Sequence, residues 1–283
     1  MARKEQFAEN EFYHLYNRGV DKRDIFLKRE DYDRFMRLLY VCNGESEIRM
    51  EVLRTLSFSE LLKMFSRRKP LVAIGAYCLM PNHFHILIRQ IQPNGISRFM
   101  QKLLTAYSMY FNTKYERSGT LFEGRFKSKR AIHDNYLRYL FAYIHLNPVK
   151  LIDSTWKEKG IQNLQEARTQ LLHYDYSSYL DFIGKVRPEG TIVSNAKEFF
   201  PEYFEDYAEF DEFINAWLTY SKEILGLEGE EGGVDMQADA RIEIVEDVKS
   251  VEDTEDAEGI EGTQSQQKPQ SQEQDQERRV TVV

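Results

Sequence analysis

The hydrophobic pattern over the first 150 residues changes period several times, which predicts a mixture of strands and helices. Apolar residues that alternate with polar ones, or form short continuous runs, predict strands at 12–18, 71–79 and 83–90. Apolar residues spaced three and four apart predict helices at 30–41, within 51–67, at 96–115 and at 134–147. A basic strand or ribbon is expected at 120–132. Short connections between the apolar strands favour an antiparallel sheet with packed helices, which is an α+β domain.

Charge is distributed unevenly and divides the chain into three segments. Residues 1–150 hold 26 Lys and Arg against 15 Asp and Glu, a net charge of +11. Residues 151–225 hold 7 against 14 (net −7), and residues 226–283 hold 5 against 17 (net −12). We interpret 1–150 as the functional core, because a basic segment is typical of nucleic-acid binding. The aromatic clusters at 151–225 favour a helical extension that completes the domain.

The last segment, 226–283, is rich in Glu, Asp, Gln, Ser and Gly and has almost no aromatic residues. Such a composition buries too little apolar surface to offset chain entropy, so a disordered acidic tail is expected. The longest apolar run, 71–80, is about half of what a helix needs to cross a bilayer. The polar start of the chain does not look like an export signal. We therefore expect a cytoplasmic, nucleoid-associated protein with no membrane span.

Two histidines on the strand predicted at 83–90 form the first candidate site. His83 and His85 are separated by Phe84, and because side chains alternate along a strand, both imidazoles point to one face. Two imidazoles at this spacing can hold one divalent ion. Structural histidines on a half-exposed strand would show the same spacing, so the pair alone leaves both interpretations open.

The helix predicted at 134–147 adds a phenol and an amide. Tyr143 and Asn147 stand four residues apart and therefore share one face. If this helix packs beside the two-histidine strand, Asn147 can complete the coordination of the ion while Tyr143 points at whatever the ion binds. An ordinary core aromatic is the alternative interpretation of Tyr143.

The ends of the same helix are also predicted. Asp134 is expected to cap it, and Pro148 is expected to stop it. The residue before a proline is disfavoured in helical geometry, so Asn147 is expected to leave the helix and turn toward a ligand. Tyr107 and Tyr110 are rival nucleophiles, but they fall on an apolar helical stripe and are interpreted as core.

Basic side chains cluster in the predicted ribbon at 120–132. Arg125, Lys127 and Lys129 are expected to alternate onto one face, where they can follow DNA phosphates. Arg130, and Arg18 from the first strand, are expected to extend this surface. Any one of these residues could be a solvated charge, so the interpretation depends on their clustering.

Several motifs occur along residues 10–180, namely FYHLYNRGVDKRDIF, YCLMPNHFHILI, GTLFEGRFKSKR, YIHLNPVK and YDYSSY. In this order they resemble the REP-associated tyrosine transposases, which are HUH-class, single-tyrosine relatives of bacterial insertion-sequence transposases acting on single-stranded DNA. The acidic tail and the length of the segment at 45–68 depart from the family pattern.

The resemblance implies a role for each motif residue. His83 and His85 would be the histidine pair of the HUH motif, Asn147 the third metal ligand, and Tyr143 the nucleophile. It also implies a ferredoxin-like or RRM-like sheet, Mg²⁺ or Mn²⁺ as the metal, and single-stranded or hairpin DNA as the partner. The protein would act as a monomer or a homodimer, and cleavage would proceed through a 5′-phosphotyrosine.

Two other functions use the same residues. A replication-initiator or relaxase-type nickase has the same histidine pair and tyrosine, although YIHLNPVK and YDYSSY fit the transposases better. A domesticated, non-catalytic nucleic-acid-binding protein could keep the fold without the reaction. All three expected ligands and the tyrosine are present here, which disfavours that second alternative.

Overall fold

The computed structural model describes residues 7–45, 53, 56–65, 69–156 and 160–224. The described residues all fall within one compact unit, Met1–Gly233. The acidic tail predicted at 226–283 lies outside the described residues, as do residues 51–52, 54–55 and 66–67 of the region predicted to be helical at 51–67. The described part of that region forms a helix at Phe58–Met64. No helix in the described part of the chain combines the length and apolar character that crossing a bilayer requires.

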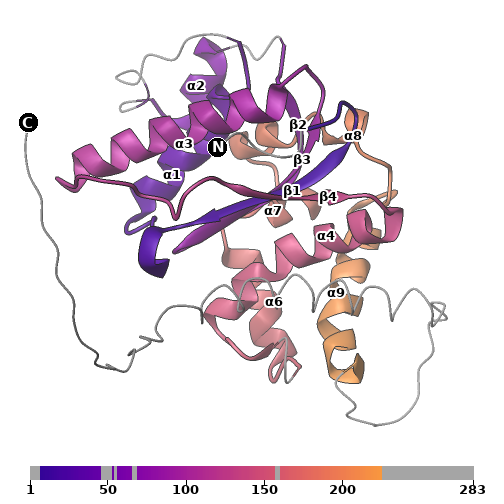
Figure 1. Cartoon of the computed structure of the whole chain (residues 1–283). Helices are drawn as coiled ribbons and strands as arrows, with labels where there is room; N and C mark the ends of the chain where they lie inside the picture. The colour runs from indigo at the N-terminus through magenta and orange to yellow at the C-terminus, as the bar shows by residue number, and fades with distance from the viewer. Residues whose placement is uncertain (1–6, 46–52, 54–55, 66–68, 157–159, 225–283) are drawn as a thin grey trace, which may run out of the picture. The chain divides into compact units, whose positions relative to one another are not determined.

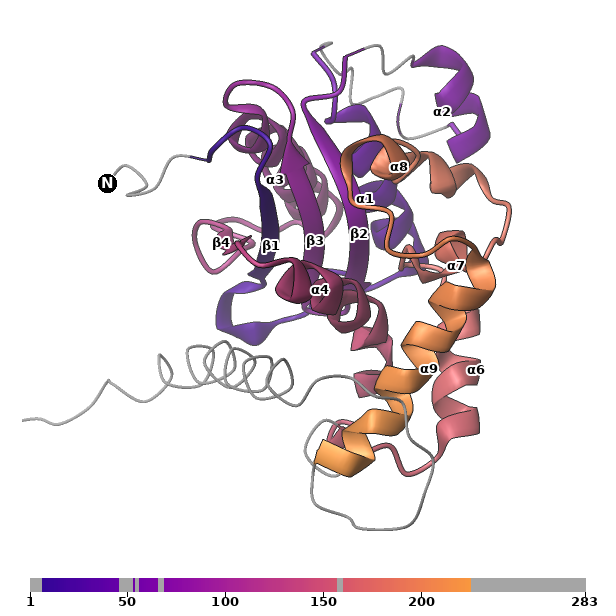
Figure 2. The ribbon, with the colours of Figure 1, turned by 90° about the vertical axis from the view of Figure 1, so that its right-hand side faces the viewer.

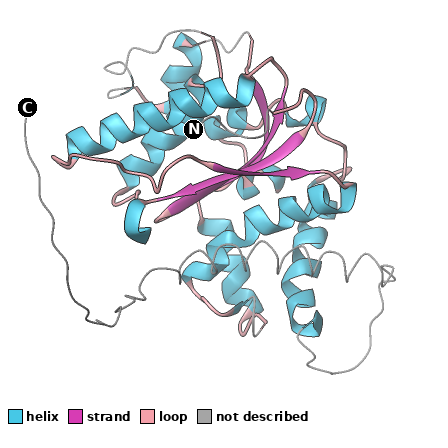
Figure 3. Ribbon diagram, in the orientation of Figure 1, coloured by secondary structure: helices cyan, strands magenta, loops and turns pink. Residues whose placement is uncertain are grey.

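Four antiparallel strands form the central sheet, in the order β2-β3-β1-β4 (Figure 3). They are β1 (Phe12–Arg18), β2 (Val72–Met80), β3 (His83–Gln90) and β4 (Lys127–Ala131). The first and third of these match the predicted ranges, and β2 is shifted by one residue at each end. The α+β class with an antiparallel sheet is therefore confirmed.

One face of the sheet is covered by α1 (Arg29–Val41) and α3 (Gly95–Lys114), and α2 (Phe58–Met64) lies at the periphery of this layer (Figure 1). Alternate residues of β3 point into this layer, and Phe84, Ile86 and Ile88 are completely buried there. Burying such side chains stabilises the fold by about 1.5–3 kcal/mol each. This apolar face orients β3, so that the intervening His83 and His85 project to the opposite face.

The opposite face is covered by α4 (Asp134–Leu146), which continues into the 3-10 helix η3 (Asn147–Leu151). Behind α4 lie α6 (Leu164–His173) and α9 (Tyr207–Ile224), which pack side by side (Figure 2). Two short helices, α7 (Tyr179–Phe182) and α8 (Ala196–Phe199), pack near β2, and a 3-10 turn, η4 (Pro188–Ile192), separates them. The helical extension therefore supports α4 from outside.

The outer edge of β2 is covered by the YDYSSY motif. The amide of Leu79 donates to the carbonyl of Tyr176 at 3.0 Å, and the amide of Ser178 donates to the carbonyl of Tyr77 at 3.0 Å. These bonds satisfy backbone groups that an exposed edge strand would present to other chains. Gly75 lies at a bulge in β2, where a Cβ atom would meet the Phe200 ring at 2.6 Å. The motif thus closes the sheet on the side away from β4.

Two predicted boundaries were wrong. The basic strand expected at 120–132 is limited to Lys127–Ala131, because Gly124 has a φ of 114° that interrupts the extended backbone. Asp134 is the first residue of α4 and not its cap, which is His133. The Asp134 carboxylate accepts a hydrogen bond from the hydroxyl of Tyr203 at 2.6 Å, so a tertiary contact has replaced the local cap.

Candidate active site

The two histidines lie on the sheet face that α4 covers. In the strand register Arg18 lies opposite His83 and Tyr16 lies opposite His85, so these β1 residues share the face. On the other side of β1, Lys127 lies opposite Tyr16 and Lys129 lies opposite His14. The sheet therefore places imidazoles and the two strand lysines on one surface.

The His83 and His85 rings are close to each other and nearly perpendicular, with centroids 4.9 Å apart and an interplanar angle of 84°. Nδ1 of His83 lies 2.6 Å from Oδ1 of Asn82, and Nδ1 of His85 lies 2.9 Å from Nε2 of His14. Histidines that ligate metals commonly hold their second nitrogen in such a bond. Both Nδ1 atoms take part in these bonds, so an ion held by the two rings would be bound through Nε2.

Tyr143 reaches this pair from α4. Its ring meets the His85 ring edge-on, with centroids 5.3 Å apart, and it meets the His14 ring at 5.6 Å. Tyr143 is 9% exposed, so it lies at the boundary between the interior and solvent. The helix that carries the tyrosine thus packs beside the two-histidine strand, which is the condition on which the sequence prediction depended.

Asn147 lies one turn after Tyr143 and is 1% exposed. Its amide nitrogen donates to the carbonyl of Tyr143 at 2.8 Å, while its buried Oδ1 has no hydrogen-bond partner within the described residues. A buried oxygen without a partner costs about 1–3 kcal/mol, which a ligand at this position would offset. The side chain therefore retains an oxygen suited to a cation.

The expected backbone of Asn147 was wrong. Its φ of −52° and ψ of −39° are helical, although a proline follows. Pro148 occupies the first turn of η3, where its missing N–H is not needed, and the hydrogen bond from the Asn147 side chain to Tyr143 holds the helical path. The position of the Asn147 side chain is therefore set by a backbone that stays helical and does not turn away from the helix.

The donor set fits a divalent ion. Two imidazole nitrogens and one amide oxygen are ligands that Mn²⁺, Mg²⁺ and Zn²⁺ accept. Among the described residues, no cluster of three or more His, Cys, Asp or Glu is arranged to hold a metal. These donor types are the ones that the sequence predicts for a metal site at His83, His85 and Asn147.

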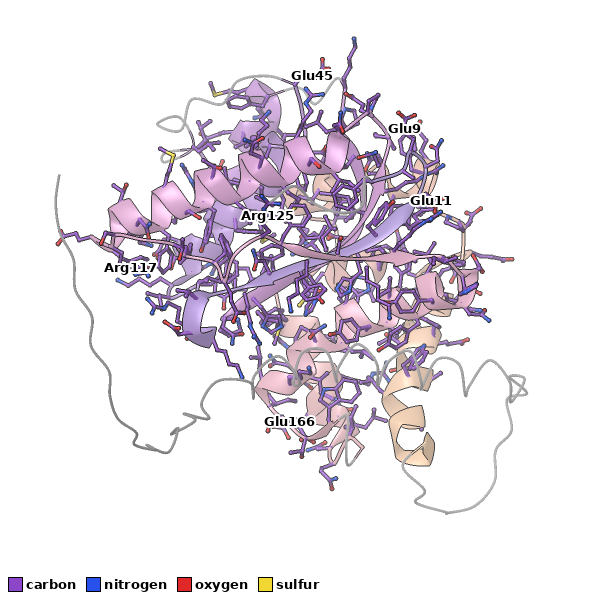
Figure 4. The ribbon with its side chains drawn as sticks, in the orientation of Figure 1. Glu9, Glu11, Glu45, Arg117, Arg125 and Glu166 are labelled. Atoms are coloured by element: carbon purple, nitrogen blue, oxygen red, sulfur yellow. The ribbon has the colours of Figure 1, made fainter. Side chains whose placement is uncertain are left out.

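The basic residues expected to bind DNA are not equivalent. Arg125 is exposed and precedes β4, so it is not part of the strand that carries Lys127 and Lys129 (Figure 4). Arg18 pairs with Glu123, and Arg130 pairs with Glu11 at 2.6 Å.

Within β4 itself the two lysines also differ in their surroundings. Lys127 is exposed, and Lys129 lies with Nζ 4.9 Å from the centre of the Tyr136 ring. Lys127 and Lys129 thus share the sheet face of the histidines. The carboxylates of Glu123 and Glu11, paired with Arg18 and Arg130, reduce the net positive charge around them.

The rival tyrosines lie on the other face of the sheet. Tyr107 is completely buried, its hydroxyl donates to the Ile25 carbonyl at 2.5 Å, and burial raises its pKa well above the ordinary value. Tyr110 donates to Asp31 at 2.9 Å, and burial raises its pKa to about 12. Both belong with the helix layer opposite the histidines, as their apolar stripe predicted.

Two residues that sequence reasoning did not select complete the surroundings of the site. His14 contacts both His85 and Tyr143, and its position in FYHLYNR, two residues before Tyr16, was the only sequence signal for it. His145 lies in YIHLNPVK, and its Nε2 is 2.7 Å from the Ser178 hydroxyl. Burial lowers the pKa of His145 to about 3, so it is neutral. This bond joins α4 to the YDYSSY segment on the edge of β2.

Comparison with known proteins places these residues in a family context. Residues 40–147 match the model of the family described as "Transposase IS200 like", and the matched range contains His83, His85, Tyr143 and Asn147. No curated protein matches the chain. A solved structure of a REP-associated tyrosine transposase bound to a REP hairpin is similar at 13% identity and a TM-score of 0.40, covering 67% of this chain and 90% of that chain. The family match by itself supports the resemblance carried by the motifs, and residues 40–147 of the chain are similar to the IS200-like transposases.

Proposed function

We propose that this protein is a transposase that cuts and rejoins single-stranded DNA through Tyr143, with DNA hairpins from palindromic repeats as its substrate in the cytoplasm. The observation that carries the proposal is the edge-on contact of the Tyr143 ring with His85, at 5.3 Å between centroids. A phenol beside two imidazoles on a partly basic surface suits attack on a phosphodiester. The transposase family match over residues 40–147 supports the same reaction class.

The proposed reaction has two balanced steps. The Tyr143 oxygen loses its phenolic proton and attacks phosphorus, and the bond from phosphorus to the 3′ oxygen breaks. The leaving 3′ oxygen takes up a proton, so the products are a 5′-phosphotyrosine and a 3′ hydroxyl. A 3′ hydroxyl later attacks the same phosphorus and releases the tyrosine, so no external energy source is needed. A divalent ion, Mg²⁺ or Mn²⁺, would supply positive charge that stabilises the leaving oxygen. His83, His85 and Asn147 would hold it beside Tyr143.

The first test is formation of a covalent adduct. We expect the full chain, incubated with Mn²⁺ and a labelled hairpin carrying an unpaired flank, to form a protein–DNA band that survives denaturing electrophoresis. EDTA should remove the band, and a fully paired duplex of the same sequence should give none. If DNA binds without any adduct under these conditions, the protein is a non-catalytic binding module and the proposal fails.

Salt dependence tests the DNA-binding surface. Each phosphate contact to single-stranded DNA contributes about −0.7 to the slope of log affinity against log salt concentration. We expect Lys127→Gln and Lys129→Gln each to weaken binding and to reduce the slope by about this amount. The matched control is Lys63→Gln, which changes an exposed lysine of α2 on the opposite layer. Slopes equal to wild type in both β4 variants would exclude this strand from the interface.

A further inference from the structure

His14 is buried beside the proposed metal ligand His85, and the proposed reaction does not use it. It is 2% exposed, and its Nε2 lies 2.9 Å from Nδ1 of His85. Its ring also meets the Tyr143 ring edge-on, with an interplanar angle of 75°. One buried imidazole therefore contacts both a proposed ligand and the proposed nucleophile.

The hydrogen bond between the two rings determines where the protons lie. A bond between two ring nitrogens needs one donor and one acceptor. An imidazole that ligates an ion through Nε2 carries its proton on Nδ1, so His85 would be the donor. Nε2 of His14 would then be the acceptor, and the His14 proton would lie on its own Nδ1.

In each of the two proposed histidine ligands, Nδ1 lies within hydrogen-bond distance of a neighbouring side chain. Nδ1 of His83 lies 2.6 Å from the side-chain oxygen of Asn82, the residue next to it in the chain. His85 has its partner on a different strand, 71 residues away in sequence. The acceptor for His85 is also part of the packing around Tyr143, so one residue can orient both groups.

We propose that His14 is a positioning residue that accepts the Nδ1 hydrogen bond of His85, directs Nε2 of His85 toward the divalent ion, and holds the Tyr143 ring beside it. This inference rests on the proposed function, because it requires His85 to be a metal ligand. Removing the acceptor is expected to weaken metal binding by about 10–100-fold.

Mn²⁺ affinity of the full chain without DNA tests this directly, by electron paramagnetic resonance of unbound Mn²⁺. We expect His14→Phe, which keeps a ring of similar size but no acceptor, to raise the dissociation constant by about 10–100-fold. His14→Gln, which restores a carbonyl acceptor, should recover most of the affinity. His133→Phe, at an exposed position, should bind as wild type does. Melting temperatures in EDTA establish that each variant is folded.

The outcomes separate this inference from the proposed function. If His85→Ala abolishes Mn²⁺ binding and His14→Phe does not change it, the role of His14 is overturned and the metal site stands. If the wild type binds no Mn²⁺, the role of His14 and the proposed metal site both fail.

Imidazole nitrogen shifts of ¹⁵N-histidine-labelled, Mg²⁺-loaded wild type provide a second measurement. The expected result is a proton on Nδ1 of His14, and a proton on its Nε2 would overturn the proposal even if His14→Phe does not fold.

Discussion

Replacing Tyr143 with phenylalanine is expected to reduce the covalent DNA adduct to background while leaving hairpin affinity nearly unchanged. The substitution removes one hydroxyl and no charge, so the salt-dependent contacts to phosphate remain. The phenylalanine ring can keep the edge-on contacts with His85 and His14, which are 5.3 and 5.6 Å from the tyrosine ring. Denaturing electrophoresis of labelled hairpin measures the adduct, and filter binding of the same hairpin measures affinity.

A neighbouring tyrosine provides the matched control. Tyr139 lies one turn before Tyr143 on α4, and the two ring centroids are 5.8 Å apart. Tyr139→Phe removes an equivalent hydroxyl from the same helix and should leave the adduct yield near that of the wild type. An adduct of normal yield in Tyr143→Phe would transfer the nucleophile to another tyrosine, which peptide mapping of the labelled adduct would identify.

Replacing Arg187 with alanine is expected to lower the free energy of unfolding by about 3–5 kcal/mol, because it leaves a buried carboxylate without its partner. Arg187 lies 2.7 Å from Asp181, and their side chains are 10% and 7% exposed. The guanidinium also donates to the carbonyls of Asp175 and Ser177. Chemical denaturation followed by circular dichroism measures the loss.

An exposed ion pair in the same extension serves as the control. Arg168 pairs with Asp211 at 2.9 Å, with side chains 40% and 34% exposed, so Arg168→Ala should cost less than about 1 kcal/mol. Adding Asp181→Asn to Arg187→Ala should regain part of the loss, because a neutral amide is easier to bury than a carboxylate. Equal losses for the two arginine variants would contradict the view that burial makes the Arg187 pair important.

The Arg187 pair also links the extension to the sheet that carries the site. Arg187 donates to the hydroxyl of Tyr77 on β2 at 3.2 Å, and Ser178 bonds both to Tyr77 and to His145 of α4. The extension thus holds the edge strand and the tyrosine helix together. Loss of Arg187 should therefore reduce adduct yield at temperatures where the chain is still folded.

Local sequence patterns determined where the strands and helices lie and which side chains share a face of each element. The alternation at 83–90 predicted that His83 and His85 share one face of their strand. The four-residue spacing predicted that Tyr143 and Asn147 share one face of their helix. These are properties of a single strand or helix, set by backbone geometry over a few residues. Nothing outside each segment was needed to predict them.

Only the tertiary structure decided which segments meet. The contact between His14 and His85 depends on the order β3-β1 and on the register of the two strands, which no local pattern specifies. The pairing of Arg18 with Glu123 and the binding of YDYSSY to the β2 edge likewise join segments far apart in sequence. Such contacts depend on how the apolar face of the whole sheet packs against the apolar faces of the helices. Which polar side chains meet is therefore decided only when the sheet and its helices have assembled.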